Sequence, residues 1–128
     1  MHVFQQESAR LPLMKLLERK TFGVPIIKHQ AIQMMLADMA ISTEAARQLV
    51  RSGMYALDMD LPTTKIASMA KTFCADSAVK VTTDAVQVLG GYGYSRDYPV
   101  EKMMRDAKIF QIFEGTNQIQ RMVIARKL

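Results

Sequence analysis

The chain has 128 residues, a net charge of +5 and 49% hydrophobic residues, which is the composition of a single globular domain with a real hydrophobic core and excludes a disordered chain. Its basic residues are dispersed, so no nucleic-acid groove is expected. The single cysteine, Cys74, excludes an intramolecular disulfide and a cysteine metal site, and its neighbours predict a packed thiol. No apolar run approaches the roughly 20 residues of a membrane span, and we expect a soluble intracellular protein.

Spacings of three and four residues between apolar side chains predict two long helices. The first extends from His29 to Leu57 and the second from about Thr63 to Gly90, where glycine can end a helix in the left-handed conformation. Because only a few residues join them, the two helices should form an antiparallel hairpin. The predicted buried stripes consist of Ile32, Met35, Leu36, Met39, Ala46, Leu49, Val50, Met54 and Leu57 in the first helix and Ile66, Met69, Ala70, Phe73, Ser77, Val81, Ala85 and Val88 in the second.

Three shorter helices complete the predicted architecture. They cover residues 13–20, 100–107 and 118–127, and the last should bury Ile119, Met122 and Val123. Residues 91–99 are predicted to form a connector rich in turns. No alternation of strand period occurs, so the sequence predicts an all-α helical bundle.

Glu114 is the candidate for chemistry, and its neighbours allow two interpretations. Helix physics favours a carboxylate stabilised by the N-terminus of the last helix. The alternative is a general base, because an apolar surround of Phe110, Ile112 and Phe113 would raise the pKa of a carboxylate. Gly115 would let a ligand approach, and backbone N–H groups at a helix start can polarise a substrate oxygen. Such a site could abstract a proton α to a carbonyl.

Other polar clusters have simple structural explanations when each is taken alone. Arg19 and Lys20 suit the C-terminal end of a helix, and His29 opens the first long helix. The glycines after residue 89 lack the preceding strand of a dinucleotide fingerprint. The two histidines are not spaced as a metal-binding pair, so no metal site is predicted.

Several motifs, in a constant order and spacing, resemble one known family. They are Arg19-Lys20-Thr21-Phe22-Gly23, His29-Gln30, the run from Asp84 to Tyr94, the run from Tyr98 to Lys102, the run from Met104 to Lys108, and Ile112-Phe113-Glu114-Gly115-Thr116. Together they resemble the C-terminal domain of acyl-CoA dehydrogenases. The resemblance implies a four-helix-bundle-like domain over residues 18–128, preceded by a divergent segment over residues 1–17, with the first helix incomplete.

The resemblance also implies an activity. Members of the family are flavoenzymes that use FAD to oxidise a fatty acyl-CoA to the trans-2-enoyl-CoA in fatty acid β-oxidation. The glutamate that matches Glu114 takes the α-proton while the β-hydrogen leaves as a hydride, and its backbone N–H binds the thioester oxygen. The position of this glutamate resembles that in acyl-CoA dehydrogenases of the short- or medium-chain type. The implied partners are further copies of the chain in a homotetramer and electron-transfer flavoprotein as acceptor. The implied location is the mitochondrial matrix in a eukaryote and the cytoplasm in a bacterium.

Matching the family position by position implies the site residues. The substrate contacts are Phe113, Gly115 and Arg126. The FAD contacts are Arg19, Lys20, Thr21 and Phe22, which match contacts to the flavin of a neighbouring subunit, together with His29, Gln30, Gln87, Val88, Leu89, Gly90, Gly91, Thr116, Asn117 and Gln118. The family's N-terminal and middle domains have no counterpart in this sequence. We therefore expect a fragment of the enzyme or, as the alternative function, an inactive helical interaction module.

Overall fold

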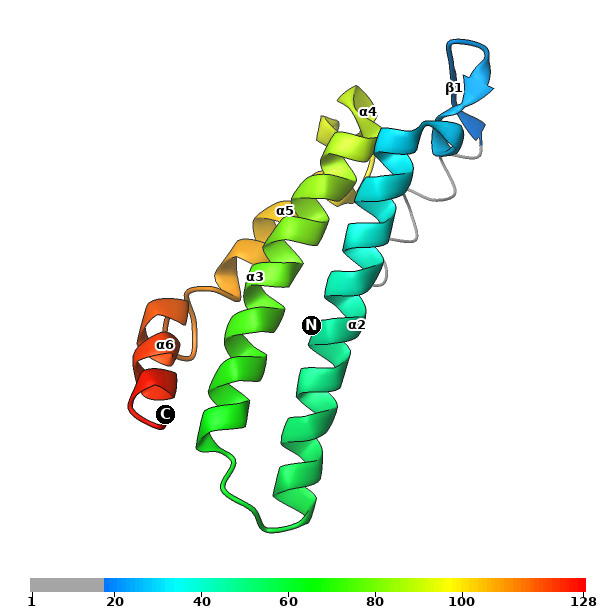
Figure 1. Ribbon diagram of the computed structural model, residues 1–128. Coiled ribbons are helices and arrows are strands. Elements are labelled where there is room, and N and C mark those ends of the chain that lie inside the picture. The colour runs from blue at the N-terminus through cyan, green and yellow to red at the C-terminus, as the bar shows by residue number, and fades with distance from the viewer. Residues whose placement is uncertain (1–17) are drawn as a thin grey trace.

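Two long antiparallel helices form the body of the molecule in a computed structural model that describes residues 18–128 (Figure 1). They are α2 (Gln30–Asp58) and α3 (Thr64–Leu89), and they lie side by side along their length. In the loop between them Asp60 adopts a φ of 54°, and the N–H of Leu61 donates to the carbonyl of Ala56 at 2.8 Å. The predicted helical hairpin is confirmed, and each of the four helix ends differs from its predicted position by one residue.

Helix α3 is the central element, because further helices cover the side that faces away from α2. These are α5 (Val100–Ile109) and α6 (Asn117–Ala125), both of which pack on α3 (Figure 1). The core between α2, α3 and α5 contains Met39, Val81, Ala85, Leu89 and Val100. Small side chains at a helix contact let the two backbones approach closely. Helix α3, which has neighbours on both sides, buries alanines, serines and threonines, including Ala75, Ser77, Ala78 and Thr82.

A short β-hairpin precedes α2. Strands β1 (Lys20–Thr21) and β2 (Val24–Pro25) pair antiparallel, and Phe22 and Gly23 between them have φ values of 51° and 80°. A 3-10 turn, η1 (Ile26–Lys28), then leads into α2. No strand was predicted here, because strands of two residues are too short to show an alternating pattern. Most of the helix predicted over residues 13–20 lies outside the described residues.

The connector after α3 also contains more structure than expected. Residues Gly91–Tyr94 form a single helical turn, α4, immediately after the break at Gly90. The ring of Tyr92 in this turn packs edge-on against Tyr98 with centroids 5.7 Å apart. This connector is therefore a packed segment that covers the end of α3, where the sequence predicted only turns.

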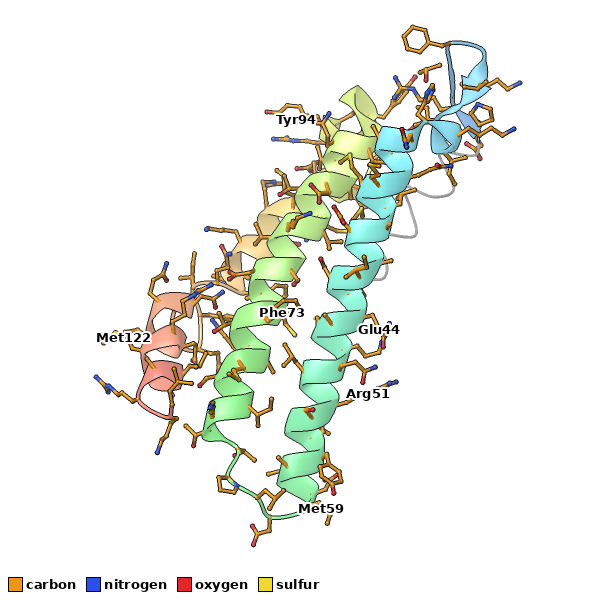
Figure 2. The ribbon with its side chains drawn as sticks, viewed as in Figure 1. Glu44, Arg51, Met59, Phe73, Tyr94 and Met122 are labelled. Atoms are coloured by element: carbon orange, nitrogen blue, oxygen red, sulfur yellow. The ribbon has the colours of Figure 1, made fainter. Side chains whose placement is uncertain are left out.

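The buried sides predicted for α6 and for the C-terminal half of α2 are partly wrong. Ile119 and Met122 are each 51% exposed, and Met122 points away from α3 in Figure 2. In α2, Met54 and Leu57 are likewise more than half exposed. Apolar periodicity identifies the side of a helix that avoids water but not the element that covers it, and within residues 18–128 nothing covers these side chains. Val50 and Phe73, also in the predicted stripes, are exposed to a smaller degree.

Candidate active site

Glu114 lies in the turn between α5 and α6, in a backbone conformation that few residues other than glycine adopt. Its φ is 56°, and that of Gly115 is 83°. Helix α6 is capped two residues later by Thr116, whose Oγ1 accepts a hydrogen bond from the N–H of Ile119 at 3.3 Å. The structure thus assigns the N-cap to Thr116 and leaves the exposed Glu114 outside the helix. Left-handed non-glycine residues are concentrated at functional sites.

The apolar surround predicted for Glu114 is open. Ile112 is 51% exposed and Phe113 is 44% exposed, although the rings of Phe110 and Phe113 pack with centroids 5.6 Å apart. Residues 18–128 therefore supply one apolar side of a pocket and do not enclose the carboxylate. An acyl chain could contact this side only if other surfaces complete the enclosure.

A network of hydrogen bonds fastens the turn to α3, and Asp76 is its centre. The Oδ1 of Asp76 accepts from Gln111 Nε2 and from Asn117 Nδ2, both at 2.7 Å, and its Oδ2 accepts from Arg121 Nη2 at 2.5 Å. Burial favours the protonated acid, but the three side-chain hydrogen bonds and the charge of Arg121 outweigh it and lower the pKa of Asp76. The carboxylate is thus held in its ionised form.

Lys71 makes a second connection between α3 and the same turn. Its Nζ donates to the carbonyl of Gly115 at 2.8 Å and to Asn117 Oδ1 at 2.7 Å. Burial lowers the pKa of Lys71, and the charge of Asp76 opposes this shift. Asn117 is only 2% exposed, and its Nδ2 also donates to the carbonyl of Thr72 at 3.3 Å. Its side chain is therefore directed into the protein, and its backbone is engaged as well, because its N–H donates to the carbonyl of Gln111 at 3.0 Å and its carbonyl accepts from Arg121 Nη1 at 3.2 Å.

A second group of predicted site residues lies at the β-hairpin. Arg19 donates from Nη1 to the carbonyl of Leu89 at 2.9 Å, and its guanidinium lies 5.2 Å from the centroid of the Tyr92 ring. Thr21 Oγ1 and His29 Nε2 are 2.8 Å apart. Beside these contacts is a cavity of about 280 Å³ lined by Glu18, Arg19, Ile26, Val88, Leu89, Tyr92 and Tyr98.

The predicted residues are therefore divided between two places on α3. Those near the hairpin meet its C-terminal end at Leu89, while those near Glu114 meet it at Thr72 and Asp76. Leu89 lies 13 positions after Asp76 in α3, which corresponds to about 20 Å along the helix. Arg126 follows the last residue of α6, at the opposite end of that helix from Glu114.

Burial limits how some predicted residues could contact a ligand. Val88 and Leu89 are only 3% and 4% exposed, and the carbonyl of Leu89 already accepts from Arg19. In contrast, Lys20, Phe22, Gln30, Gln87, Gly91 and Gln118 are exposed. No sequence pattern pointed to Asp76, Lys71, Gln111 or Arg121, because their contacts join positions 35 to 46 residues apart. No cluster of His, Cys, Asp or Glu in the described part of the chain could hold a metal ion. None of the helices within residues 18–128 has the length and apolarity of a membrane span.

Comparison with known proteins identifies the class of domain. The family model for the C-terminal domain of acyl-CoA dehydrogenases matches residues 6–128. The chain is 58% identical over 111 residues to cyclohexane-1-carbonyl-CoA dehydrogenase of Geobacter metallireducens and 53% identical over 111 residues to an acyl-CoA dehydrogenase of Bacillus subtilis. Both alignments cover 87% of this chain and 29% of the relative.

Solved structures give the same result. Butyryl-CoA dehydrogenase from Megasphaera elsdenii matches with a TM-score of 0.94 and 44% identity, over 97% of this chain and 32% of that one. The chain therefore belongs to the acyl-CoA dehydrogenase family, as its all-α C-terminal domain. It spans less than a third of the length of these relatives. The family and the fold class predicted from the sequence are confirmed.

Proposed function

We propose that this chain forms the C-terminal part of an FAD-dependent acyl-CoA dehydrogenase in which Glu114 is the catalytic base. The observation that carries the proposal is the exposed, left-handed Glu114–Gly115 pair, held against the start of α6 in a domain of this family. Such a conformation presents both the carboxylate and the backbone of Glu114 to a ligand. The reaction is the α,β-dehydrogenation of an acyl-CoA thioester, with a fatty acyl-CoA of β-oxidation as the expected substrate.

The residues around Glu114 support defined roles in this reaction. The carboxylate accepts the α-proton, and the absence of a side chain on Gly115 leaves room for the thioester. Within residues 18–128 no acceptor engages the N–H of Glu114, which makes it available to stabilise the negative charge on the thioester oxygen. Phe113 contacts the acyl chain from its open apolar side, and Arg126 binds the CoA portion.

The described residues fit the chemistry of FAD, which when bound supplies the acceptor for the β-hydrogen as hydride. Arg19 meets the end of α3 at the carbonyl of Leu89. The hairpin beside it carries Lys20 and contacts His29, so this region offers the cationic and hydrogen-bonding groups that suit a pyrophosphate. Thr116 and Gln118 offer polar groups at the start of α6. We propose that the hairpin residues serve the flavin of a neighbouring copy and that the α6 residues serve the chain's own flavin.

A second function has its own supporting observation. Exposed apolar side chains occur on α6 and on α2, with Ile119, Met122, Met54 and Leu57 all more than half exposed. Each pair is spaced three residues apart and so shares one side of its helix, and contiguous exposed apolar surface marks contacts with other proteins. The alternative proposal is a helical module without activity that associates with acyl-CoA dehydrogenase subunits. In the enzyme, the same surface would support a homotetramer, with electron-transfer flavoprotein as electron acceptor, in the mitochondrial matrix or the bacterial cytoplasm.

Replacing the base tests the enzymatic proposal. A chimera in which this chain replaces the segment that it matches in the Bacillus subtilis acyl-CoA dehydrogenase provides the remaining domains. Glu114→Gln removes the base without changing size, and we expect turnover to fall by about 10²–10⁴-fold with flavin content unchanged, the usual contribution of a general base. Glu44→Gln is the matched control, because Glu44 is an exposed carboxylate on the side of α2 away from α6 (Figure 2).

The measurement is the reduction of an artificial electron acceptor with butyryl-, octanoyl- and cyclohexane-1-carbonyl-CoA, alongside flavin absorbance. Relatives named for linear and cyclic acyl-CoA substrates make this panel informative. Equal turnover of the Glu114→Gln and Glu44→Gln chimeras would refute the role of Glu114. A parental chimera that binds no flavin would favour the interaction module, which is then tested by adding the 128-residue chain to a full-length enzyme and measuring assembly size.

A further inference from the structure

We infer that Asp76 and Lys71, both on α3, are positioning residues that hold the Glu114–Gly115 turn in its left-handed conformation. Neither side chain is expected to touch the substrate, since both act through the backbone and through residues beside the turn. The catalytic consequence of this inference rests on the proposed role of Glu114. The structural part, that two side chains of α3 determine the shape of the turn, can be tested without any activity.

The hydrogen bonds of Asp76 require a group that only accepts. Gln111 and Asn117 donate to one oxygen and Arg121 donates to the other. An amide in place of the carboxylate would turn one of these oxygens into an NH₂ group that faces a donor. At that position a carboxylate satisfies every partner, whereas its uncharged isostere cannot.

The partners of Asp76 lie before and after the turn in the sequence, so one carboxylate links the two ends of the turn. Gln111 precedes Glu114, while Asn117 and Arg121 follow it. A backbone hydrogen bond links the same two ends, because the N–H of Asn117 donates to the carbonyl of Gln111 at 3.0 Å. Asp76 therefore fixes the two ends of the turn at a single point on α3.

Lys71 acts on the turn itself. It donates to the carbonyl of Gly115, and Gln120 Nε2 donates to the carbonyl of Glu114 at 3.1 Å. Both carbonyls of the left-handed pair are thus hydrogen-bonded. Lys71 also engages Asn117 Oδ1, which orients the buried amide so that its NH₂ group faces Asp76. The two connections from α3 support each other through Asn117.

This arrangement explains how a non-glycine residue can remain in a sparsely populated conformation. Such a conformation persists only where the surrounding structure determines it. The conformation directs the N–H of Glu114 and its carboxylate, and small displacements of either group strongly reduce the rate of a positioned reaction. A turn released from α3 would keep the base in the sequence but lose its alignment.

Amide hydrogen exchange of the 128-residue chain tests the structural part. We expect Asp76→Asn and Lys71→Met each to accelerate exchange in residues 110–118, including the Asn117 amide, by about tenfold or more, the factor expected when hydrogen bonds to charged groups are lost. Lys71→Arg, which keeps a cationic donor, should restore most of the protection. Asp84→Asn is the matched control on α3, since Asp84 pairs only with Lys80 among the contacts described, at 2.7 Å.

The pattern of exchange separates positioning from general destabilisation. Faster exchange confined to residues 110–118, with the centre of α3 near Val81 unchanged, supports the inference. Unchanged exchange of the turn, or an equal acceleration along all of α3, would overturn it. If Asp76→Asn does not fold, Lys71→Met decides the question, because Lys71 lies partly exposed at the side of α3 and its removal leaves the core intact.

Turnover in the chimera tests the catalytic consequence. Asp76→Asn should lower kcat by about tenfold or more, because a displaced catalytic group loses alignment, with little change in KM or flavin content, while Asp84→Asn retains the parental kcat. If Glu114→Gln abolishes turnover but Asp76→Asn does not reduce it, the positioning role of Asp76 is refuted while the proposed role of Glu114 is retained. If Glu114→Gln has no effect, the proposed function fails, and the exchange measurement still decides whether α3 holds the turn.

Discussion

Gly93 is the position where a single added carbon has the clearest structural consequence. A Cβ built on Gly93 would lie 2.6 Å from the carbonyl oxygen of Val86, 2.9 Å from its Cα and 2.9 Å from the Cβ of Leu89. Two of these are backbone atoms in the last turns of α3, so no side-chain rotation relieves the overlap. We predict that Gly93→Ala forces α4 away from α3.

The size of the effect follows from the cost of overpacking. Forcing an extra carbon into a well-packed site costs about 1–3 kcal/mol. For a chain of 128 residues, 1 kcal/mol corresponds to a change of about 4 °C in the unfolding midpoint, so Gly93→Ala should lower the midpoint by about 4–12 °C. Because Tyr92 contacts Arg19 across this region, the hairpin should loosen as well.

The assay is thermal unfolding followed by circular dichroism at the helical band. Gly53→Ala is the control, since Gly53 lies inside α2 and nothing stands within 4 Å of its added Cβ. Alanine at an unobstructed helical position should stabilise the chain by about 0.4–1 kcal/mol. A Gly93→Ala protein that unfolds at the parental temperature would show that α4 does not pack against α3 as described.

Two further predictions concern titratable groups. The pKa of Asp76 is lowered in the folded protein, because its hydrogen bonds and the charge of Arg121 outweigh burial. The ionised carboxylate therefore stabilises the fold at pH values above its pKa in the unfolded chain, about 4. This stabilisation is lost as the pH falls through the lower pKa of the folded protein. Denaturant unfolding as a function of pH should therefore show a weaker acid dependence for Asp76→Asn than for the parent, and identical slopes would contradict this. Burial raises the pKa of Cys74, which is 2% exposed with its Sγ 3.6 Å from the carbonyl of Ala46. A thiol reagent should accordingly modify the folded chain slowly and the urea-unfolded chain rapidly, and rapid modification of native protein would show that the thiol is accessible.

The sequence determined those features that depend on local chemistry. Apolar spacing defined α2 and α3 because a 3.6-residue period is written directly into neighbouring positions, and Gly90 marked the end of α3. The motifs between Arg19 and Thr116 indicated the family for the same reason, since the residues within each motif are contiguous. The strands at Lys20–Thr21 and Val24–Pro25 were missed, because two residues are too few to establish a period.

Only the tertiary structure decided which surfaces are covered and what holds the turn. Ile119 and Met122 belong to an apolar side of α6, yet they are exposed because α6 meets α3 through other residues, including the buried Asn117. Periodicity cannot identify the partner of an apolar side. The contact between Asp76 and Asn117 joins positions 41 residues apart, and no local signal predicts such a pair. The sequence therefore predicted Glu114 as the candidate base, whereas the hydrogen bonds that connect its turn to α3 arise only when the chain folds.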